Sequence, residues 1–458
     1  MRYFWIAVLF FILFSNSFAC IWWDWKTRCV WDWFVYENML HTELFFYVII
    51  ALVIFEFALS KTLSYLNTTK WSNKLPKELE EIYDEKKYAK SMNYEKAKYN
   101  FSNISSIISF NIMILVLIFW VFWKLYDFLL NFTHNNILLT LYFFWIIAFV
   151  QSLFSLPFSY YSTFVIEEKY GFNKMTKKLF FIDFIKWLLL SFIIWGLILA
   201  IITWIYNITR DNFWFYAWIL ITSFSVFMMM FYSSLIVPLF NKQTPLEKWK
   251  LRDEIEAFAH SVWFKLDNIY VIDWSKRSSK ANAYFSGFGP KKRIVLYDTL
   301  INDLTNNELV AVLAHEIGHY KKKHTFQMLA FSTIQTWIMF YILWITLWYR
   351  EASLALWSNV SSFALWLLAF GILFTPISIV FGLIWNILSR KNEYEADHYA
   401  AKHYKANKLK SALIKLSRNN LSNLRPHPAY EFFHYSHPTV LKRLHALDKF
   451  INKNKKHS

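Results

Sequence analysis

Seven long apolar stretches restrict this chain to folds that can bury them. Each stretch is long enough to cross a hydrocarbon core, which needs roughly 20 residues of helix. The chain of 458 residues is 56% hydrophobic and 21% aromatic, with a mean hydropathy of +0.26, above the apolar fraction of typical soluble domains. We therefore expect a polytopic α-helical membrane protein with about seven transmembrane helices, at residues 44–63, 104–130, 137–163, 179–206, 213–240, 326–349 and 363–388.

A shorter apolar run at the N-terminus resembles a cleavable signal peptide. A basic residue precedes the run 3–18, and the small residues Ser17 and Ala19 stand just before Cys20. A basic start, a short apolar stretch and a small-x-small site are typical of signal peptides; an eighth span is the alternative. Cleavage would leave the two cysteines, Cys20 and Cys29, on the exported side, where they could pair. Lipid modification of Cys20 is a second option.

The net charge of +17 follows the membrane topology. Basic residues concentrate between the first two spans and in alternate segments after it, whereas the segments 131–136, 207–212 and 349–360 hold at most one Lys or Arg each. Segments rich in Lys and Arg face the cytoplasm. We therefore expect cytoplasmic basic segments, an outward-facing mature N-terminus, contacts with membrane lipid and no nucleic-acid partner.

The motif HEIGH at residues 315–319 indicates zinc chemistry. Upstream, Thr305 and Glu308 form a capping-box pattern that starts a helix about ten residues before His315. The i, i+4 spacing puts His315 and His319 on one face, where both imidazoles can bind one Zn²⁺, and places Glu316 to take a proton from a water on the metal. The motif alone is a weak signal, because two hydrogen-bonded core histidines would look the same.

A later segment offers the third protein ligand that a catalytic zinc site requires. Glu393 and Asp397 are also spaced i, i+4, so they share one helix face. One can bind the metal while the other holds a ligand imidazole from behind. Glu395 points elsewhere. An exposed, charged helix end is the alternative interpretation of this segment.

Between the fifth and sixth spans the pattern predicts a small α+β catalytic unit. It reads as a helix, strands at 268–272, 281–285 and 293–297, and then the HEIGH helix. A strand edge beside that helix can bind an extended peptide by main-chain pairing; an ordinary hairpin is the alternative. We expect five parts: a signal-peptide-like segment (1–19), a transmembrane region (20–240), the catalytic unit (241–325), two further spans (326–389) and a C-terminal region (390–458).

Six blocks of sequence carry a family resemblance. They are IEEKYGFNK (166–174), PLFNKQTPLE (238–247), SKRSSKANAYFSGF (275–288), HEIGH (315–319), SRKNEYEADHYA (389–400) and SHPTVLKRL (436–444). Together they resemble the CAAX prenyl protease 1 family of seven-span zinc metalloproteases, in order, over residues 44–447. Heat-shock-type relatives share HExxH and ExxxD but lack the GFNK and PLFNK blocks and several spans, so they fit less well.

The resemblance implies a set of site residues. By motif, His315, His319 and Glu393 would bind one zinc ion, Glu316 would activate water, Asp397 would support the ligands, and Asn282, His437 and Arg443 would contact substrate or buttress the site. We expect His437 to stabilise the oxyanion, with a surface capping histidine as the alternative. The histidines His324, His398 and His434 are expected at solvent or interfaces. The family further implies a zincin-like unit capping a large chamber between the spans.

Tryptophan replaces small residues at several positions of the pattern. The chain has 24 Trp and only 7 Gly, where average usage gives roughly 30 Gly. Trp249, Trp263 and Trp274 stand where glycine is expected, and Trp274 follows a strand at a junction suited to positive φ. We hypothesise that such residues are UGA codons read as glycine in the native organism. An aromatic belt at the membrane interface is the alternative, but it does not explain Trp in the soluble unit.

The sequence therefore predicts an integral membrane zinc metalloendopeptidase acting on peptides or membrane-associated proteins. The resemblance implies removal of the residues that follow a prenylated cysteine. A signal peptide and the suspected codon usage favour a bacterial inner membrane with a cytoplasmic catalytic unit. Two alternatives remain: a quality-control protease for membrane proteins, and a non-catalytic channel or transporter with a vestigial site.

Overall fold

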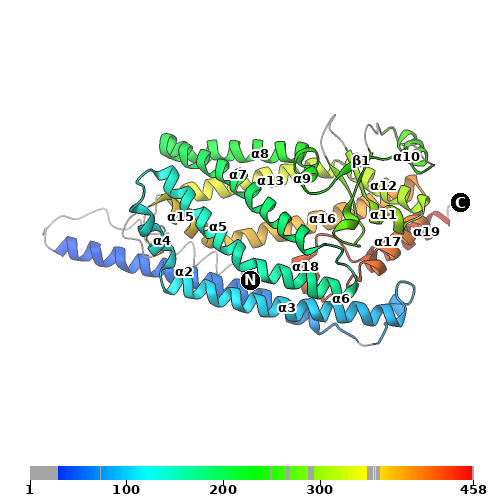
Figure 1. The fold of residues 1–458 in the computed structure, drawn as a ribbon, viewed down its shortest axis with the longest axis horizontal. Helices are drawn as coiled ribbons and strands as arrows, with labels where there is room; N and C mark the ends of the chain where they lie inside the picture. The colour runs from blue at the N-terminus through cyan, green and yellow to red at the C-terminus, as the bar shows by residue number, and fades with distance from the viewer. Residues whose placement is uncertain are drawn as a thin grey trace.

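The protein is an elongated bundle of helices with a small sheet near one end (Figure 1). The computed structural model describes residues 29–72, 74–247, 250–264, 269–286, 293–347, 354, 356 and 362–455. Most helices run along the long axis, and the C-terminal helices gather beside the sheet (Figure 1). The expected signal peptide, Cys20, Trp249 and the turn at 287–290 lie outside the described residues.

The helices of the membrane part are long and apolar. Among the described residues, five stretches qualify as spans, and a sixth arises if two helices bent by 52° at residue 374 count as one. The elements are α2 (Cys29–Thr68), α3 (Glu85–Ile118), α4 (Val121–Leu130), α5 (Asn136–Tyr161), the π-helix η3 (Ser162–Glu167), α6 (Glu168–Tyr170), α7 (Lys177–Thr209), η4 (Arg210–Asn212), α8 (Phe213–Leu235), α9 (Val237–Phe240), α13 (His324–Leu347), α15 (Phe363–Leu373) and α16 (Thr375–His403).

Helix α7 exposes large apolar side chains, as a helix that faces lipid does. Ile193, Leu197 and Trp195 are 67%, 63% and 61% exposed, which is unfavourable in water but ordinary against hydrocarbon. One expected helix differs from the prediction: the span at 104–130 is two helices, α3 and α4, because Trp120 between them takes a left-handed backbone with φ 57°. The apolar stretch Lys177–Phe240 contains two separate helices, α7 and α8, which correspond to the spans predicted at 179–206 and 213–240.

A four-stranded sheet forms the centre of the soluble part. Its strands are β1 (Gln243–Pro245), β2 (Ile269–Ile272), β3 (Ala283–Ser286) and β4 (Arg293–Tyr297), in the order β1-β2-β4-β3. The central pair β2–β4 is parallel and both outer pairs are antiparallel. The three expected strands are present; β1 was not foreseen. Because β3 is an end strand of this order, one of its edges is not paired with another strand of the sheet.

The core of the soluble part draws on distant segments. Helices α10 (Lys250–Ser261), α11 (Asp298–Asp303), α12 (Asn306–Lys321), α17 (Ala406–Asn419), α18 (Pro428–His434) and α19 (Val440–Lys455), with the short η2 (Lys77–Leu79) and η5 (Trp274–Lys276), complete the chain. Buried Ile255, Ile294, Leu313 and Leu444 belong to one apolar cluster that also contains Tyr94 from α3. The sheet, the HEIGH helix and the C-terminal helices are therefore packed as one body.

The backbone at Trp263 has the geometry that glycine favours. Trp263 has φ 52° and is 91% exposed. Its N–H donates to the carbonyl of His260 at 3.0 Å, and the N–H of Phe264 donates to the carbonyl of Ala259 at 2.8 Å. These two bonds form a Schellman motif with Trp263 at its left-handed position, which is usually Gly. The recoding hypothesis gains support there. Trp274, in contrast, is not among the described residues with positive φ, so that part of the expectation is wrong.

We predict that Trp263→Gly stabilises the protein by about 1 kcal/mol, because glycine removes the Cβ strain of the left-handed conformation. Thermal unfolding of the detergent-solubilised chain measures the change. Trp274→Gly is the matched control and should destabilise the protein, because the Trp274 ring packs against Tyr297 with centroids 5.1 Å apart. A lower melting temperature for Trp263→Gly would contradict the assignment, and UGG codons at Trp249, Trp263 and Trp274 would refute the recoding hypothesis.

Candidate metal centre

Helix α12 is fixed at its N-terminus by a buried carboxylate. The predicted capping box is present: Thr305 is the N-cap, and its N–H donates to Glu308 Oε2 at 2.8 Å. Glu308 is only 3% exposed and also accepts from Lys415 Nζ at 2.7 Å and Ser411 Oγ at 2.5 Å, both on α17. Burial by itself raises the pKa of Glu308, but these donors outweigh it and lower the pKa to about 2. The box therefore also ties α12 to α17.

We predict that Glu308→Gln lowers the free energy of unfolding at pH 7 by about 1–3 kcal/mol, because Lys415 loses a charged partner. The folded pKa lies below the ordinary value of 4.5, so the ionised carboxylate stabilises the fold above pH 4.5 and this contribution is lost as the pH falls toward 2. Unfolding curves of the parent and the variant should therefore converge between pH 4.5 and pH 2. Exposed Glu256→Gln is the control, and a parent–variant difference independent of pH would contradict the prediction.

A close crossing of α12 and α16 brings the motif residues together. A Cβ on Gly318 would lie 3.1 Å from the carbonyl oxygen of Ala396 and 3.2 Å from its Cα. The helices can approach this closely because residue 318 has no side chain. The crossing places Glu393 and Asp397, on one face of α16, opposite the two histidines of α12, as their i, i+4 spacing predicts.

Three donor atoms converge on one point. His315 Nε2 lies 3.1 Å from His319 Nε2, His319 Nε2 lies 3.2 Å from Glu393 Oε1, and His315 Nε2 lies 3.5 Å from Glu393 Oε2. Ligand atoms around a tetrahedral zinc ion, each 2.0–2.1 Å from the metal, lie about 3.3 Å apart. Buried Glu393 Oε2 also has no well-aligned hydrogen bond within the described part of the chain, although Arg443 Nη1 lies 3.2 Å from it. The three residues therefore fit a metal ion, and among the described residues they are the group of His and Glu side chains that could hold one; they are called the ligand group below.

The second layer of contacts is polar and buried. His315 Nδ1 lies 2.9 Å from Asp397 Oδ1. The same carboxylate accepts a bidentate pair from Arg443 on α19, with Nε–Oδ2 at 2.8 Å and Nη2–Oδ1 at 2.6 Å. Arg443 Nη1 reaches Glu393 Oε2 at 3.2 Å. The structure thus places Asp397 and Arg443 behind the ligand group, where a carboxylate can orient an imidazole.

Electrostatics at the centre favour a cation. Burial lowers the pKa of His315, but hydrogen bonds to Asp397 and Glu393 outweigh it and raise the pKa to about 10. Burial raises the pKa of Glu316, and the positive charges of His315 and His319 only partly oppose it. The carboxylates therefore surround His315 with more negative charge than Arg443 alone offsets, so a divalent ion between the ligands would be stabilised.

His437 and Asn282 approach the centre differently. His437 Nε2 lies 3.3 Å from Glu393 Oε1, and the side chain is 59% exposed, so it borders the ligand group and remains accessible. Its Nδ1 lies 2.9 Å from Ser436 Oγ. Asn282, directly before β3, is exposed, and its Oδ1 accepts from the N–H of Ala283 at 2.9 Å. Both residues are reachable by a substrate.

One histidine expected at a solvent or interface position lies in the centre instead. His324, the first residue of α13, is 4% exposed, and its Nδ1 lies 3.0 Å from His319 Nδ1. Its Nε2 lies 3.3 Å from Glu395 Oε2. The expectation for His324 was therefore wrong: sequence spacing gave no signal, because the contact depends on a turn after α12. Glu395 does point away from the metal ligands, toward His324.

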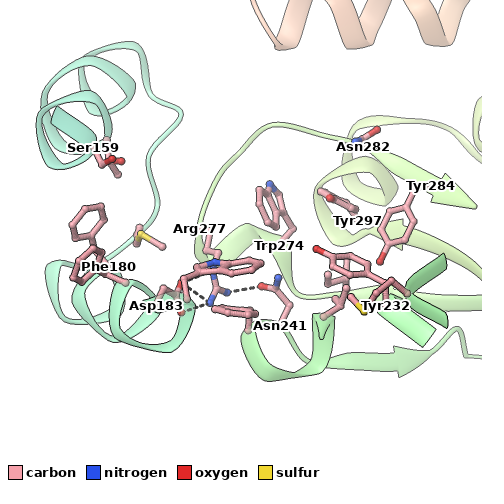
Figure 2. A pocket seen from close by; sticks show the side chains of 18 of the residues that line it. Ser159, Phe180, Asp183, Tyr232, Asn241, Trp274, Arg277, Asn282, Tyr284 and Tyr297 are labelled. Carbon is pink, nitrogen blue, oxygen red and sulfur yellow. Dashed lines mark hydrogen bonds and ion pairs between the residues drawn. The ribbon is translucent and has the colours of Figure 1, made fainter. Parts of the chain in front are cut away.

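A large cavity lies between the membrane helices and the sheet. It has a volume of about 1070 Å³. Figure 2 shows Asn282, Tyr284 and Tyr297 on the sheet side and Ser159 and Phe180 on the helix side. On its floor Arg277 pairs with Asp183 at 2.9 Å and with Asn241 at 2.5 Å. The lining also includes Thr325, the residue that follows His324 in the sequence.

A second cavity of about 750 Å³ continues into the bundle. It shares Ser155, Phe184 and Trp187 with the first cavity, and its wall is otherwise almost entirely apolar. The two cavities therefore adjoin at these three residues, and together they are called the chamber below.

Removal of one ligand tests the centre directly. We expect Glu393→Ala to weaken zinc binding by more than about 100-fold, beyond the roughly 10–100-fold typical of outer-sphere changes. Zinc content of the purified full chain, and competition with a chromophoric chelator, measure this. Exposed Glu256→Gln should keep about one zinc per chain. Equal zinc content in parent and Glu393→Ala would exclude Glu393 as a ligand.

Two family models match the chain in tandem. The model described as CAAX prenyl protease N-terminal, five membrane helices, matches residues 64–242, and the model of peptidase family M48 matches residues 245–451. Together they cover most of the chain.

Relatives match over nearly their whole length. CAAX prenyl protease 1 of Saccharomyces cerevisiae is 36% identical over 436 residues, which is 89% of this chain and 96% of the relative. The CAAX prenyl protease 1 homolog of Homo sapiens is 33% identical over 424 residues, covering 82% of this chain and 89% of the relative. The crystal structure of S. mikatae Ste24p superposes with a TM-score of 0.83 at 37% identity, covering 88% of this chain and 99% of that chain.

Proposed function

Because this chain belongs to peptidase family M48 and to its CAAX prenyl protease group, it is a membrane metalloprotease, and we propose that His315, His319 and Glu393 bind its zinc ion. The observation that carries the proposal is the 3.1–3.5 Å spacing of their donor atoms. Zinc bound there would polarise the scissile carbonyl and lower the pKa of the attacking water. The family match favours proteolysis over a channel or a heat-shock-type quality-control protease.

Glu316 is proposed as the general base. It is adjacent to His315 on α12, half-buried, and its pKa is raised because burial disfavours its ionised form. A raised pKa brings a carboxylate nearer to the working pH and makes it a better proton acceptor. Glu316 would take the proton of the attacking water and deliver it to the leaving amine.

His437 is proposed to stabilise the oxyanion. Its Nε2 lies beside Glu393 Oε1, and its exposed ring faces the side from which a substrate can arrive. Its Nδ1 lies 2.9 Å from Ser436 Oγ; in the tautomer in which that hydroxyl donates to Nδ1, the ring carries its proton on Nε2 and can donate it to the developing negative charge. Asp397 and Arg443 do not reach the substrate side; they hold His315 and Glu393 in place.

We propose that the substrate binds as an extended strand along β3. Strand β3 is the end strand nearest α12, and its sheet neighbour β4 occupies only one edge. Main-chain pairing at the other edge would lay a peptide past the ligand group with little demand on its sequence. Asn282, at the start of β3, would then contact the peptide backbone.

The relatives' names indicate the substrate class. We propose that the chain cleaves peptides next to a prenylated cysteine, as the name CAAX prenyl protease implies for its relatives. Two adjoining cavities support this, since one has polar groups beside the sheet and the other an apolar wall among the helices. A ligand with both a peptide and a hydrocarbon chain would match both environments.

The membrane arrangement follows from charge. Counting α7 and α8 separately, and α15–α16 as one bent span, gives seven spans. We propose that the catalytic unit is cytoplasmic, because the basic segments then all lie on the inner side. The relatives compared above come from eukaryotes, so they do not support the expected bacterial inner membrane.

We predict that Glu316→Gln keeps zinc and loses peptide cleavage by a factor of about 10²–10⁴, the range of general-base catalysis. A farnesylated CAAX peptide, the same peptide without the lipid, and an unfolded membrane protein would be assayed in parallel with zinc content. Preference for the farnesylated peptide supports the proposed substrate, and preference for the unfolded protein supports quality control. Turnover by Glu316→Gln equal to that of the parent would exclude the mechanism.

A further inference from the structure

A second histidine stands behind the metal ligand His319. His324 Nδ1 lies 3.0 Å from His319 Nδ1, with ring centroids 5.1 Å apart and ring planes at 73°. On its other side, His324 Nε2 lies 3.3 Å from Glu395 Oε2. His324 is 4% exposed, whereas the side chain of Glu395 is 39% exposed. The three residues form a chain of contacts that begins at the ligand group and ends at the surface.

If His319 binds a metal, the protons on the rings of His319 and His324 can be placed in only one way. His319 Nε2 faces His315 Nε2 and Glu393 Oε1, so it must be bare to bind a metal, and the ring then carries its proton on Nδ1. That proton is donated to His324 Nδ1, which must be bare, so His324 carries its own proton on Nε2. The Nε2 proton is donated in turn to Glu395 Oε2. Every ring nitrogen in the chain is used.

The turn that places His324 is held in an uncommon conformation. Lys323, directly before it, has φ 60°, in the left-handed region that costs a non-glycine residue roughly 1 kcal/mol. Its N–H donates to the carbonyl of Tyr320 at 2.9 Å, and its own carbonyl accepts from Gln327 at 3.0 Å. The turn folds the start of α13 back against the last turn of α12, which brings His324 to His319.

The two histidine ligands are therefore supported in different ways. His315 donates directly to buried Asp397, which Arg443 also grips. His319 has no direct carboxylate partner behind it among the described residues; its Nδ1 meets His324. We propose that His324 and Glu395 are positioning residues that fix the ring and tautomer of His319. This inference rests on the proposed zinc site and extends it to a pair that does not touch the metal.

Zinc affinity of the purified full chain tests the pair without reference to catalysis. We expect His324→Ala to raise the zinc dissociation constant about 10–100-fold, the usual effect of losing an outer-sphere partner. His324→Asn retains an acceptor oxygen near the Nδ1 position and should recover at least part of that loss. Glu395→Gln, near the surface and of equal size, should weaken zinc binding in the same direction without unfolding the protein.

The matched control is His398→Ala. His398 lies on α16 but its ring packs against Phe450, so the zinc dissociation constant should stay within about twofold of the parent. With saturating zinc, His324→Ala should lower kcat and leave KM within about twofold, because His324 does not contact substrate. Melting temperatures of the zinc-free proteins report any general loss of fold.

Four outcomes separate the possibilities. Weaker zinc binding in both His324→Ala and Glu395→Gln, with recovery in His324→Asn, supports positioning. Zinc affinities within twofold of the parent in both variants would overturn it while leaving the protease assignment intact, provided that the parent binds zinc. Weaker binding in His324→Asn equal to that in His324→Ala would also overturn it, because the acceptor would then not matter. A parent chain that binds no zinc would instead refute the proposed function.

Discussion

The crossing of α12 and α16 at Gly318 is the contact on which the centre depends. A Cβ there would lie 3.1 Å from the carbonyl oxygen of Ala396, so even alanine would press the two helices apart by a few tenths of an ångström. With glycine, the carboxylate of Glu393 lies 3.2–3.5 Å from the two imidazoles of α12. The capping box at the start of α12 and the grip of Arg443 on α16 then fix the two helices along their length. Catalytic geometry is thus a consequence of backbone packing.

That packing gathers buried negative charge that a metal ion would offset. Glu316, Glu393 and Asp397 gather around one guanidinium, and all interact with Arg443. Buried carboxylates without sufficient positive charge are costly. The pKa of His315 is raised for the same reason, because the carboxylates of Asp397 and Glu393 favour its protonated form. A cation between the three donor atoms would compensate the charge, and binding of the ion would then be coupled to the stability of the helix pair.

Local spacing predicted much of the centre, and tertiary placement accounts for the rest. The pairs His315–His319 and Glu393–Asp397 follow from i, i+4 geometry, and Thr305–Glu308 from capping, so the sequence revealed all of them. His324 was missed because it reaches His319 only through the left-handed turn at Lys323. The break between α3 and α4 was missed because hydropathy does not register backbone conformation at Trp120. Residue spacing along a sequence predicts which face of a helix a side chain occupies. It rarely predicts which side chain of the next helix that residue will contact.

The chamber has a polar region beside the sheet and an apolar region among the membrane helices. One wall is the sheet, where Asn282, Tyr284 and Tyr297 offer polar groups, and the paired Arg277 and Asp183 lie between this wall and the helices (Figure 2). Because that ion pair is internally satisfied, it adds polarity without a free charge, and an uncharged peptide segment can lie over it. Farther from the sheet the wall becomes apolar. A substrate with a peptide part and a hydrocarbon part would therefore be oriented by solvation, with its peptide end toward the sheet.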